Sequence, residues 1–217
     1  EIASCLVGSE MCIRDRGGPM HWSRIVDMPV AGLILLARPL LGPATAELVA
    51  CITVPLLLLG GLAGTLHLAA RRLGDPVLAL VTVALLLTTP SILVQFTPLR
   101  IDHHGWQIWM ATIALAGALD SGRVRGGVTS ALALAVWLQI SSEALPYVAL
   151  FAGLFALRQW LDGREASRFI AFAATLGGAA VALLALLRGK AALLHDQCDA
   201  LSAAYAWPLV ALAVLVP

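Results

Sequence analysis

One short stretch of the chain gathers side chains that could do chemistry. Residues 98–107 read PLRIDHHGWQ, and five of these ten side chains are charged, imidazole or amide groups, although long apolar runs flank the stretch. Ionisable groups are costly in lipid and usually mark functional sites in membrane proteins. We therefore predict that this stretch is a loop outside the cytoplasm that faces an active site.

Asp102, His103 and His104 supply one carboxylate and two imidazoles. A carboxylate can act as a general base or bind a hard cation, and histidine is a metal ligand or proton shuttle. We expect Asp102 and His103 to be catalytic, and Asp102 and His104 to be the ligands of a divalent metal ion, Mg²⁺ or Mn²⁺. Neighbouring residues on a helix point about 100° apart, so the spacing alone is a weak metal signal. The alternative for Asp102 is that it caps the next helix.

Glu143 is a second carboxylate, placed at the end of an apolar run. A charged group costs about 2.5–3.5 kcal/mol at the bilayer centre and less near the interface. We expect Glu143 to be catalytic, because it falls on the same face as Asp102. The alternative is a glutamate that caps a helix or reaches into the interface.

A third polar group precedes the first apolar run and contains His21, Trp22, Arg24 and Asp27. Arginine binds phosphate oxygens through two parallel hydrogen bonds. We expect His21, Trp22, Arg24 and Arg100 to bind substrate, with Arg24 on a phosphate. The alternative is that Trp22 and Arg24 only anchor a helix in the membrane interface.

The composition defines the class of protein that positions these residues. The chain has 217 residues, of which 60% are hydrophobic and 12% charged, with a mean hydropathy of +0.90. Soluble domains carry about 25% charged residues. The sequence therefore indicates an integral membrane protein of the all-α class, a polytopic bundle of transmembrane helices. The net charge of +1 gives no sign of a nucleic-acid partner, and the four cysteines form no CxxC pair.

Residues 1–16 differ in character from the rest of the chain. They have neither an initiator Met nor the pattern of a signal peptide, and residues 5–16, CLVGSEMCIRDR, resemble a transposase sequencing adapter translated in frame. We expect this segment to be an artefact, and the natural chain to begin near Gly17 without its own N-terminus. We also expect the C-terminus to be truncated, since the chain stops inside an apolar run at Pro217.

The remaining chain divides into an external segment and a membrane bundle. Residues 17–43 are predicted to form an external loop and a helix that lies in the interface, and residues 44–217 about seven membrane spans. Pro90 should kink or end the second span. The expected spans are 44–68, 76–96, 104–119, 126–140, 144–160, 169–187 and 202–217. Seven basic residues on one set of loops against five on the other favour a cytoplasmic position for the first set. Asp102, Glu143 and residues 17–27 then share the non-cytoplasmic face.

Three segments together resemble membrane glycosyltransferases of the GT-C superfamily, and more narrowly bacterial relatives of the oligosaccharyltransferase catalytic subunit. They are PMHWSRIVD at 19–27, RIDHHG at 100–105 and EALPY at 143–147. The order and spacing match from about Gly17 onward. Asp102 matches the family's second acidic motif, and His21 and Arg24 match the end of its first external loop, whereas Glu143 matches no motif of the family.

The resemblance implies transfer of a sugar from a polyprenyl-phosphate-linked donor, at the non-cytoplasmic face of the bacterial inner membrane. The acceptor would be a lipid-linked glycan, a lipid or a protein, and an acidic residue would assist attack at the anomeric carbon. The family's first acidic residue would lie upstream of Gly17, so we expect the chain as it stands to be inactive. Two other functions stay open: a secondary transporter or permease, which would carry ionisable groups near the bilayer midplane, and a membrane subunit without catalysis.

Overall fold

The computed structural model describes residues 24–194 and 201–216, and these residues form helices and no strand. The expected all-α class is therefore confirmed for this part of the chain. Four short 3₁₀ helices interrupt the α-helices: η1 (Val94–Phe96), η2 (Ser142–Ala144), η3 (Gly163–Glu165) and η4 (Lys190–Leu193). The α-helices are α2 (Asp27–Leu41), α3 (Pro43–Arg72), α4 (Pro76–Leu87), α5 (Pro90–Leu93), α6 (His104–Ala118), α7 (Arg123–Ile140), α8 (Leu145–Leu161), α9 (Ala166–Arg188) and α10 (Ala203–Leu215).

Three described helical stretches are long and apolar enough to cross a membrane. They are Pro43–Arg72, Ser142–Leu161 and Gly163–Arg188, and the pair Pro76–Leu87 with Pro90–Phe96 adds a fourth if it is one broken span. A helix lies at each of the seven expected spans, but α6 has 15 residues and α10 has 13. At 1.5 Å per residue both fall short of about 30 Å of hydrocarbon. The count of seven spans remains a prediction.

Pro90 breaks the second expected span, as the sequence predicted. The helix α4 ends at Leu87, α5 begins at Pro90, and the two halves are bent by 69°. Proline lacks the N–H that would continue the hydrogen-bond ladder, and it restricts the residue before it to extended conformations. The hydroxyls of Thr88 and Thr89 each donate to the carbonyl of Leu85 and satisfy it at the break.

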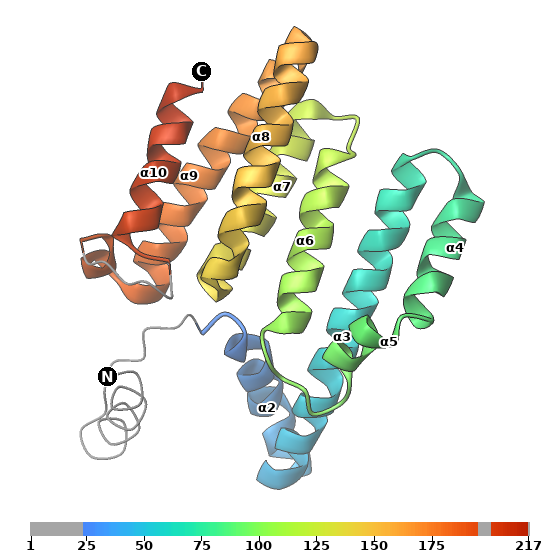
Figure 1. Cartoon of the computed structure of the whole chain (residues 1–217). Coiled ribbons are helices and arrows are strands. Elements are labelled where there is room, and N and C mark those ends of the chain that lie inside the picture. The colour runs from blue at the N-terminus through green and yellow to red at the C-terminus, as the bar shows by residue number, and fades with distance from the viewer. Residues whose placement is uncertain (1–23, 195–200, 217) are drawn as a thin grey trace.

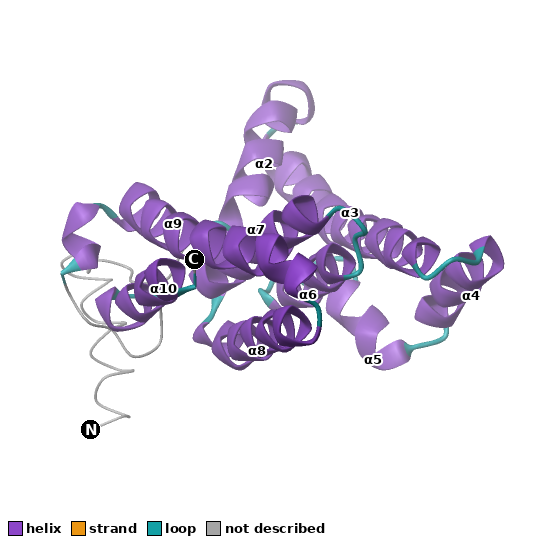
Figure 2. Ribbon diagram, turned by 90° about the horizontal axis from the view of Figure 1, so that it is seen from above, coloured by secondary structure: helices purple, strands orange, loops and turns teal. Residues whose placement is uncertain are grey.

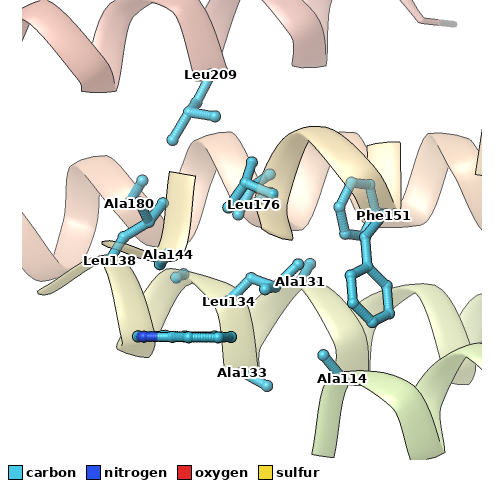
Figure 3. Packing of buried hydrophobic residues seen from close by; sticks show 14 of the residues in the cluster. Ala114, Ala131, Ala133, Leu134, Leu138, Ala144, Phe151, Leu176, Ala180 and Leu209 are labelled. Carbon is cyan, nitrogen blue, oxygen red and sulfur yellow. The ribbon is translucent and has the colours of Figure 1, made fainter. Parts of the chain in front are cut away.

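The main core joins α6, α7 and α9, with α8 and α10 packed around them (Figure 1). Figure 3 shows Leu134 and Leu138 of α7 facing Leu176 and Ala180 of α9, with Leu209 of α10 pointing toward the same layer. The helices approach closely because small residues lie between them, as is common in membrane bundles. This packing fixes both ends of α6 and α7, where the polar residues gather.

A second, smaller cluster joins α2, α3 and the α4–α5 region to α6. It is built on Leu58, Leu62 and Phe96, with Trp109 of α6 packed against it. The Trp109 indole occupies the space beside Gly61, where an added Cβ would lie 2.6 Å from the ring, so this glycine serves helix packing. Seen from above, α4 lies at the edge of the assembly beyond α3, and α9 and α10 lie toward the opposite edge (Figure 2).

The helix α2 falls within the segment predicted to lie in the interface. It has no fully buried residue, and Leu35, Leu36 and Leu40 are exposed. Val30 and Leu33 in its first half pack against the second cluster. This face anchors α2 beside the end of the bundle at which α6 begins.

Candidate functional site

A proline in α3 leaves one backbone carbonyl free, and this carbonyl binds the loop between η1 and α6. Pro55 has no N–H, so the carbonyl of Cys51, four residues earlier in α3, loses its partner within the helix. The backbone N–H of Leu99 donates to this carbonyl over 3.0 Å. Leu99 adopts a left-handed conformation with φ of 71°, which is uncommon and strained for a branched side chain. The α3 backbone thus holds the loop that carries Asp102.

Asp102 links its neighbours on both sides. Its Oδ2 accepts a hydrogen bond of 2.8 Å from Nε of Arg100, and its Oδ1 accepts one of 3.1 Å from the backbone N–H of His104. Nδ1 of His104 lies 3.4 Å from Oδ1. The N-cap position of α6 is His103 and has no side-chain cap bond, so Asp102 is not the N-cap that the alternative interpretation predicted. Its carboxylate instead accepts the first N–H of α6 from one position before the N-cap. The rings of His103 and His104 stack with centroids 4.4 Å apart, so the two imidazoles lie together beside this carboxylate.

Glu143 reaches the same end of the bundle through Gln107. The Nε2 amide of Gln107 donates a hydrogen bond of 2.8 Å to Oε2 of Glu143 and joins α6 to η2. Gln107 is 8% exposed, whereas Glu143 is exposed, and the backbone N–H of Glu143 donates to Oγ of Ser141. Within the described residues, Oε1 of Glu143 has no hydrogen-bond partner. Gln107 lies at the end of the polar stretch 98–107, but no local pattern in the sequence assigned it a role.

Two aromatic rings, Tyr147 of α8 and Trp137 of α7, lie at this polar end. Tyr147 lies one helical turn beyond Glu143 and packs against Trp137, with ring centroids 4.5 Å apart. Tyr147 is 44% exposed and Trp137 is 4% exposed, so the buried indole supports one face of the tyrosine ring. The indole N–H of Trp137 is buried without a hydrogen-bond partner among the described residues. An exposed ring beside a carboxylate can stack on an apolar face of a ligand while the carboxylate accepts its hydroxyl groups.

The third predicted group is only partly described. Arg24 lies in the turn before α2, and its carbonyl accepts the backbone N–H groups of Asp27 and Met28. Its side chain is exposed. His21 and Trp22 lie outside the described residues, so their predicted role in substrate binding stays a prediction.

The predicted metal site lacks a complete ligand set in the described part of the chain. No group of three or more His, Cys, Asp or Glu side chains there could hold a metal ion. Asp102 and His104 offer two ligands, but both oxygens of Asp102 already accept hydrogen bonds and Arg100 places a positive charge beside them. These residues do not fit a resident Mg²⁺ or Mn²⁺ ion, and no chemical step is assigned to a metal.

The opposite end of the bundle holds a polar cluster that the sequence did not predict. Asp120, in the turn between α6 and α7, is 2% exposed. Arg125 donates to both of its oxygens, over 2.8 and 2.6 Å, and Nη2 of Arg72 lies 2.7 Å from Oδ2. The hydrogen bonds from Arg125 outweigh the effect of burial and, together with the Gly122 N–H and the charge of Arg72, lower the pKa of Asp120 from 3.8 to about 2.

Glu165 forms the second centre of this cluster. Nε of Arg123 donates to its Oε1 over 2.8 Å, Nε of Arg168 donates to its Oε2 over 2.7 Å, and Nη2 of Arg158 lies 3.2 Å from Oε2. Arg168 is 2% exposed. The two carboxylates thus tie α3, α7, α8 and α9 to one another around the end of α6. We call the five arginines the arginine cluster: Arg72, Arg123, Arg125, Arg158 and Arg168.

Three of these arginines also satisfy the carbonyl groups that end α6. Arg168 donates to the carbonyls of Gly117 and Asp120 over 3.2 and 2.7 Å, Arg158 donates to that of Ala118 over 2.8 Å, and Arg72 donates to that of Ala116. Unpaired carbonyls at a helix end favour cations. In the sequence these residues were only counted as topology signals, because their partners lie about 40 or more positions away.

Comparisons with protein-family models, with curated proteins and with solved structures find no match to this chain.

Proposed function

We propose that this chain is a membrane glycosyltransferase of the GT-C type, which transfers a sugar from a polyprenyl-phosphate-linked donor at the non-cytoplasmic face of the bacterial inner membrane. The observation that carries the proposal is the hydrogen bond between Gln107 and Glu143. It brings the polar side chains of two separate predicted motifs together at one end of the bundle, at the opposite end from the arginine cluster. The donor's phosphate lies at the interface, where this end meets it.

The contacts divide the work between the two carboxylates. Both oxygens of Asp102 are engaged, so Asp102 orients Arg100 and the start of α6. Glu143 keeps Oε1 available, and its position is fixed by Gln107. Glu143 is therefore the general base that takes a proton from the acceptor hydroxyl as it attacks the anomeric carbon. Arg100 and Arg24 stabilise the negative charge that develops on the departing phosphate.

Tyr147 gives this site a surface for the sugar ring. Its exposed ring is supported from behind by Trp137 and lies one turn from Glu143. Stacking on the ring would orient the sugar, and the carboxylate would accept its hydroxyls. His103 and His104 lie at the start of α6 beside Asp102 and can carry protons between the site and water.

The broken helix α4–α5 is a described feature that favours the transporter alternative, because transporters place substrate sites at broken spans. The polar groups at this break are Thr88 and Thr89, whose hydroxyls donate back to Leu85. No ionisable residue lies between Pro76 and Phe96. The break therefore lacks the charged groups that couple transport to an ion, and the transferase is the better supported function.

Binding measurements with purified chain in lipid nanodiscs test the proposal. The ligands are undecaprenyl phosphate and undecaprenyl-phosphate-linked glucose. We expect Arg100→Gln to weaken both about tenfold, because it removes a charge-assisted contact to phosphate. We expect Glu143→Gln and Tyr147→Leu to weaken only the glucose-bearing ligand. Glu47→Gln, which changes an exposed carboxylate on α3, is the matched control and should alter neither.

Three outcomes would refute the proposal. Neither ligand binds, or the glucose-bearing ligand binds no differently after Glu143→Gln and Tyr147→Leu, or Glu47→Gln weakens binding as much as Arg100→Gln. Uptake of free sugar into proteoliposomes, lost on substitution at the α4–α5 break, would support the transporter instead.

A further inference from the structure

The arginine cluster carries more positive charge than its own acidic partners neutralise. Five guanidinium groups surround the carboxylates of Asp120 and Glu165, which leaves three uncompensated positive charges. The centre of the cluster is shielded from water, since Arg168 and Asp120 are each 2% exposed, whereas the side chains of Arg125, Arg123 and Arg158 at its rim are 71%, 40% and 36% exposed. Like charges held close together around this centre repel one another, and an additional anion at the exposed rim would relieve this repulsion.

Arg123 presents the groups with which such an anion would bind. Its Nε donates to Glu165, which fixes the plane of the guanidinium, while Nη1 and Nη2 have no hydrogen-bond partner within the described residues. The Arg123 side chain is 40% exposed, so these two groups are accessible. Two parallel N–H groups of arginine match two oxygens of a phosphate.

The position of Arg123 and Arg125 strengthens this argument. Both lie in the first turn of α7, which contains no acidic residue. Cations in the first turn oppose the helix dipole, whereas an anion in the same place would be favoured by it. Arg164 of η3 lies nearby and forms an ion pair with Asp162, whose carboxylate is also stabilised by the positive charge of Arg123, so this pair adds a second guanidinium without changing the net charge.

Apolar groups beside the cluster indicate that the anion belongs to a lipid. Trp160 and Leu161 end α8 and are 83% and 74% exposed. They follow Arg158 and precede Arg164 in the chain, so they lie at the same end of the bundle. An exposed tryptophan next to arginines is typical of the membrane interface, and anionic headgroups collect at such basic surfaces.

We propose that the arginine cluster binds the phosphate of an anionic phospholipid, with Arg123 and Arg164 as headgroup ligands and Trp160 and Leu161 beside the acyl chains. This site lies at the end of the bundle where α6 and α8 finish, opposite the end where these two helices begin, just after Asp102 and Glu143 (Figure 1). It does not depend on the proposed transferase function, and either proposal can fail without the other.

Native mass spectrometry of the full chain in non-ionic detergent tests the site. Dioleoyl phosphatidylglycerol is titrated against the wild type, the double variant R123Q/R164Q and the matched control R38Q/K190Q, which removes the same charge at the other end of the bundle. We expect saturable binding of phosphatidylglycerol, weakened about tenfold or more in R123Q/R164Q and unchanged in the control. Dioleoyl phosphatidylcholine should bind much more weakly at every concentration.

Several results would overturn the proposal. One is equal binding of phosphatidylglycerol and phosphatidylcholine, and another is an equal loss of affinity in both double variants. Displacement of the lipid by excess inorganic phosphate would identify a site for a free anion and overturn the assignment to a lipid. If R123Q/R164Q does not fold, as judged by circular dichroism, Arg123→Lys replaces it. This variant keeps the charge and removes the paired N–H groups, so unchanged affinity in it would also contradict the proposed role of Arg123.

Discussion

Gly127→Ala should separate two helices that the core requires to be in contact. A Cβ added at Gly127 of α7 would lie 2.3 Å from the backbone oxygen of Arg168 and 3.1 Å from the backbone nitrogen of Phe172, both on α9. Ordinary contact begins at 3.4 Å, so α7 and α9 must move apart by about 1 Å. Overpacking costs about 1–3 kcal/mol, and a clash with backbone, which cannot rotate away, belongs at the upper end.

Alanine also favours the helical state by about 1 kcal/mol relative to glycine. The net expectation for Gly127→Ala is a loss of about 2 kcal/mol in the free energy of unfolding. Gly178→Ala, on α9, is the matched control, because nothing lies within 4 Å of its added Cβ, and it should gain up to about 1 kcal/mol. Unfolding by sodium dodecyl sulfate in mixed micelles, followed by circular dichroism, measures both. Equal stabilisation of the two variants would show that α7 and α9 do not pack as described.

Three further changes probe the two ends of the bundle. The pKa of Asp120 is about 2 in the folded protein and 3.8 ordinarily. The ionised carboxylate therefore contributes about 2 kcal/mol to the free energy of unfolding above about pH 4, and this contribution is lost as the pH falls toward 2. Acid unfolding in micelles should show the loss, and the same dependence of stability on pH in Asp120→Asn as in the wild type would contradict it. Gln107→Leu removes the hydrogen bond that positions Glu143, so it should weaken binding of the sugar-bearing donor without changing binding of undecaprenyl phosphate. An equal loss of affinity for both ligands would mean that the hydrogen bond serves folding alone. Pro55→Ala supplies an N–H that competes with the Leu99 N–H for the carbonyl of Cys51, so amide hydrogen exchange at Leu99 should accelerate. Unchanged exchange would show that Pro55 does not keep this carbonyl free for Leu99.

The sequence predicted helices well because apolar length and proline act locally. Pro90 ends a helix through its own missing N–H and ring, so its effect could be placed before any tertiary contact was known. That Asp102 bonds the first N–H of α6 could be expected for the same reason, since the two residues are neighbours, but the N-cap itself is His103, one residue later than predicted. The number of spans was harder to predict, because a helix such as α6 can be apolar and still shorter than the bilayer.

Contacts between distant segments explain what the sequence could not show. Gln107 meets Glu143 across 36 positions, and Arg168 meets the carbonyl of Asp120 across 48. Neither pair leaves a periodic or local signal, so a glutamine in an apolar helix and an arginine at a helix start could not be assigned partners. The arginines were correctly recognised as basic residues near helix ends, but their role in holding the end of α6 emerges only from the packing of α7, α8 and α9 around it.

The two ends of α6 differ in how firmly they are held, and this difference fits the two proposals. At its carboxyl end, guanidinium groups from three helices bind its last carbonyls, and two shielded carboxylates join them. At its amino end, the loop depends on one backbone hydrogen bond to α3 and contains the strained Leu99. Local opening is therefore easier at the end that carries Asp102 and Glu143. Entry of a long lipid-linked donor would be easier at the end held by fewer contacts, whereas a headgroup site of fixed guanidinium groups suits the end held by more of them.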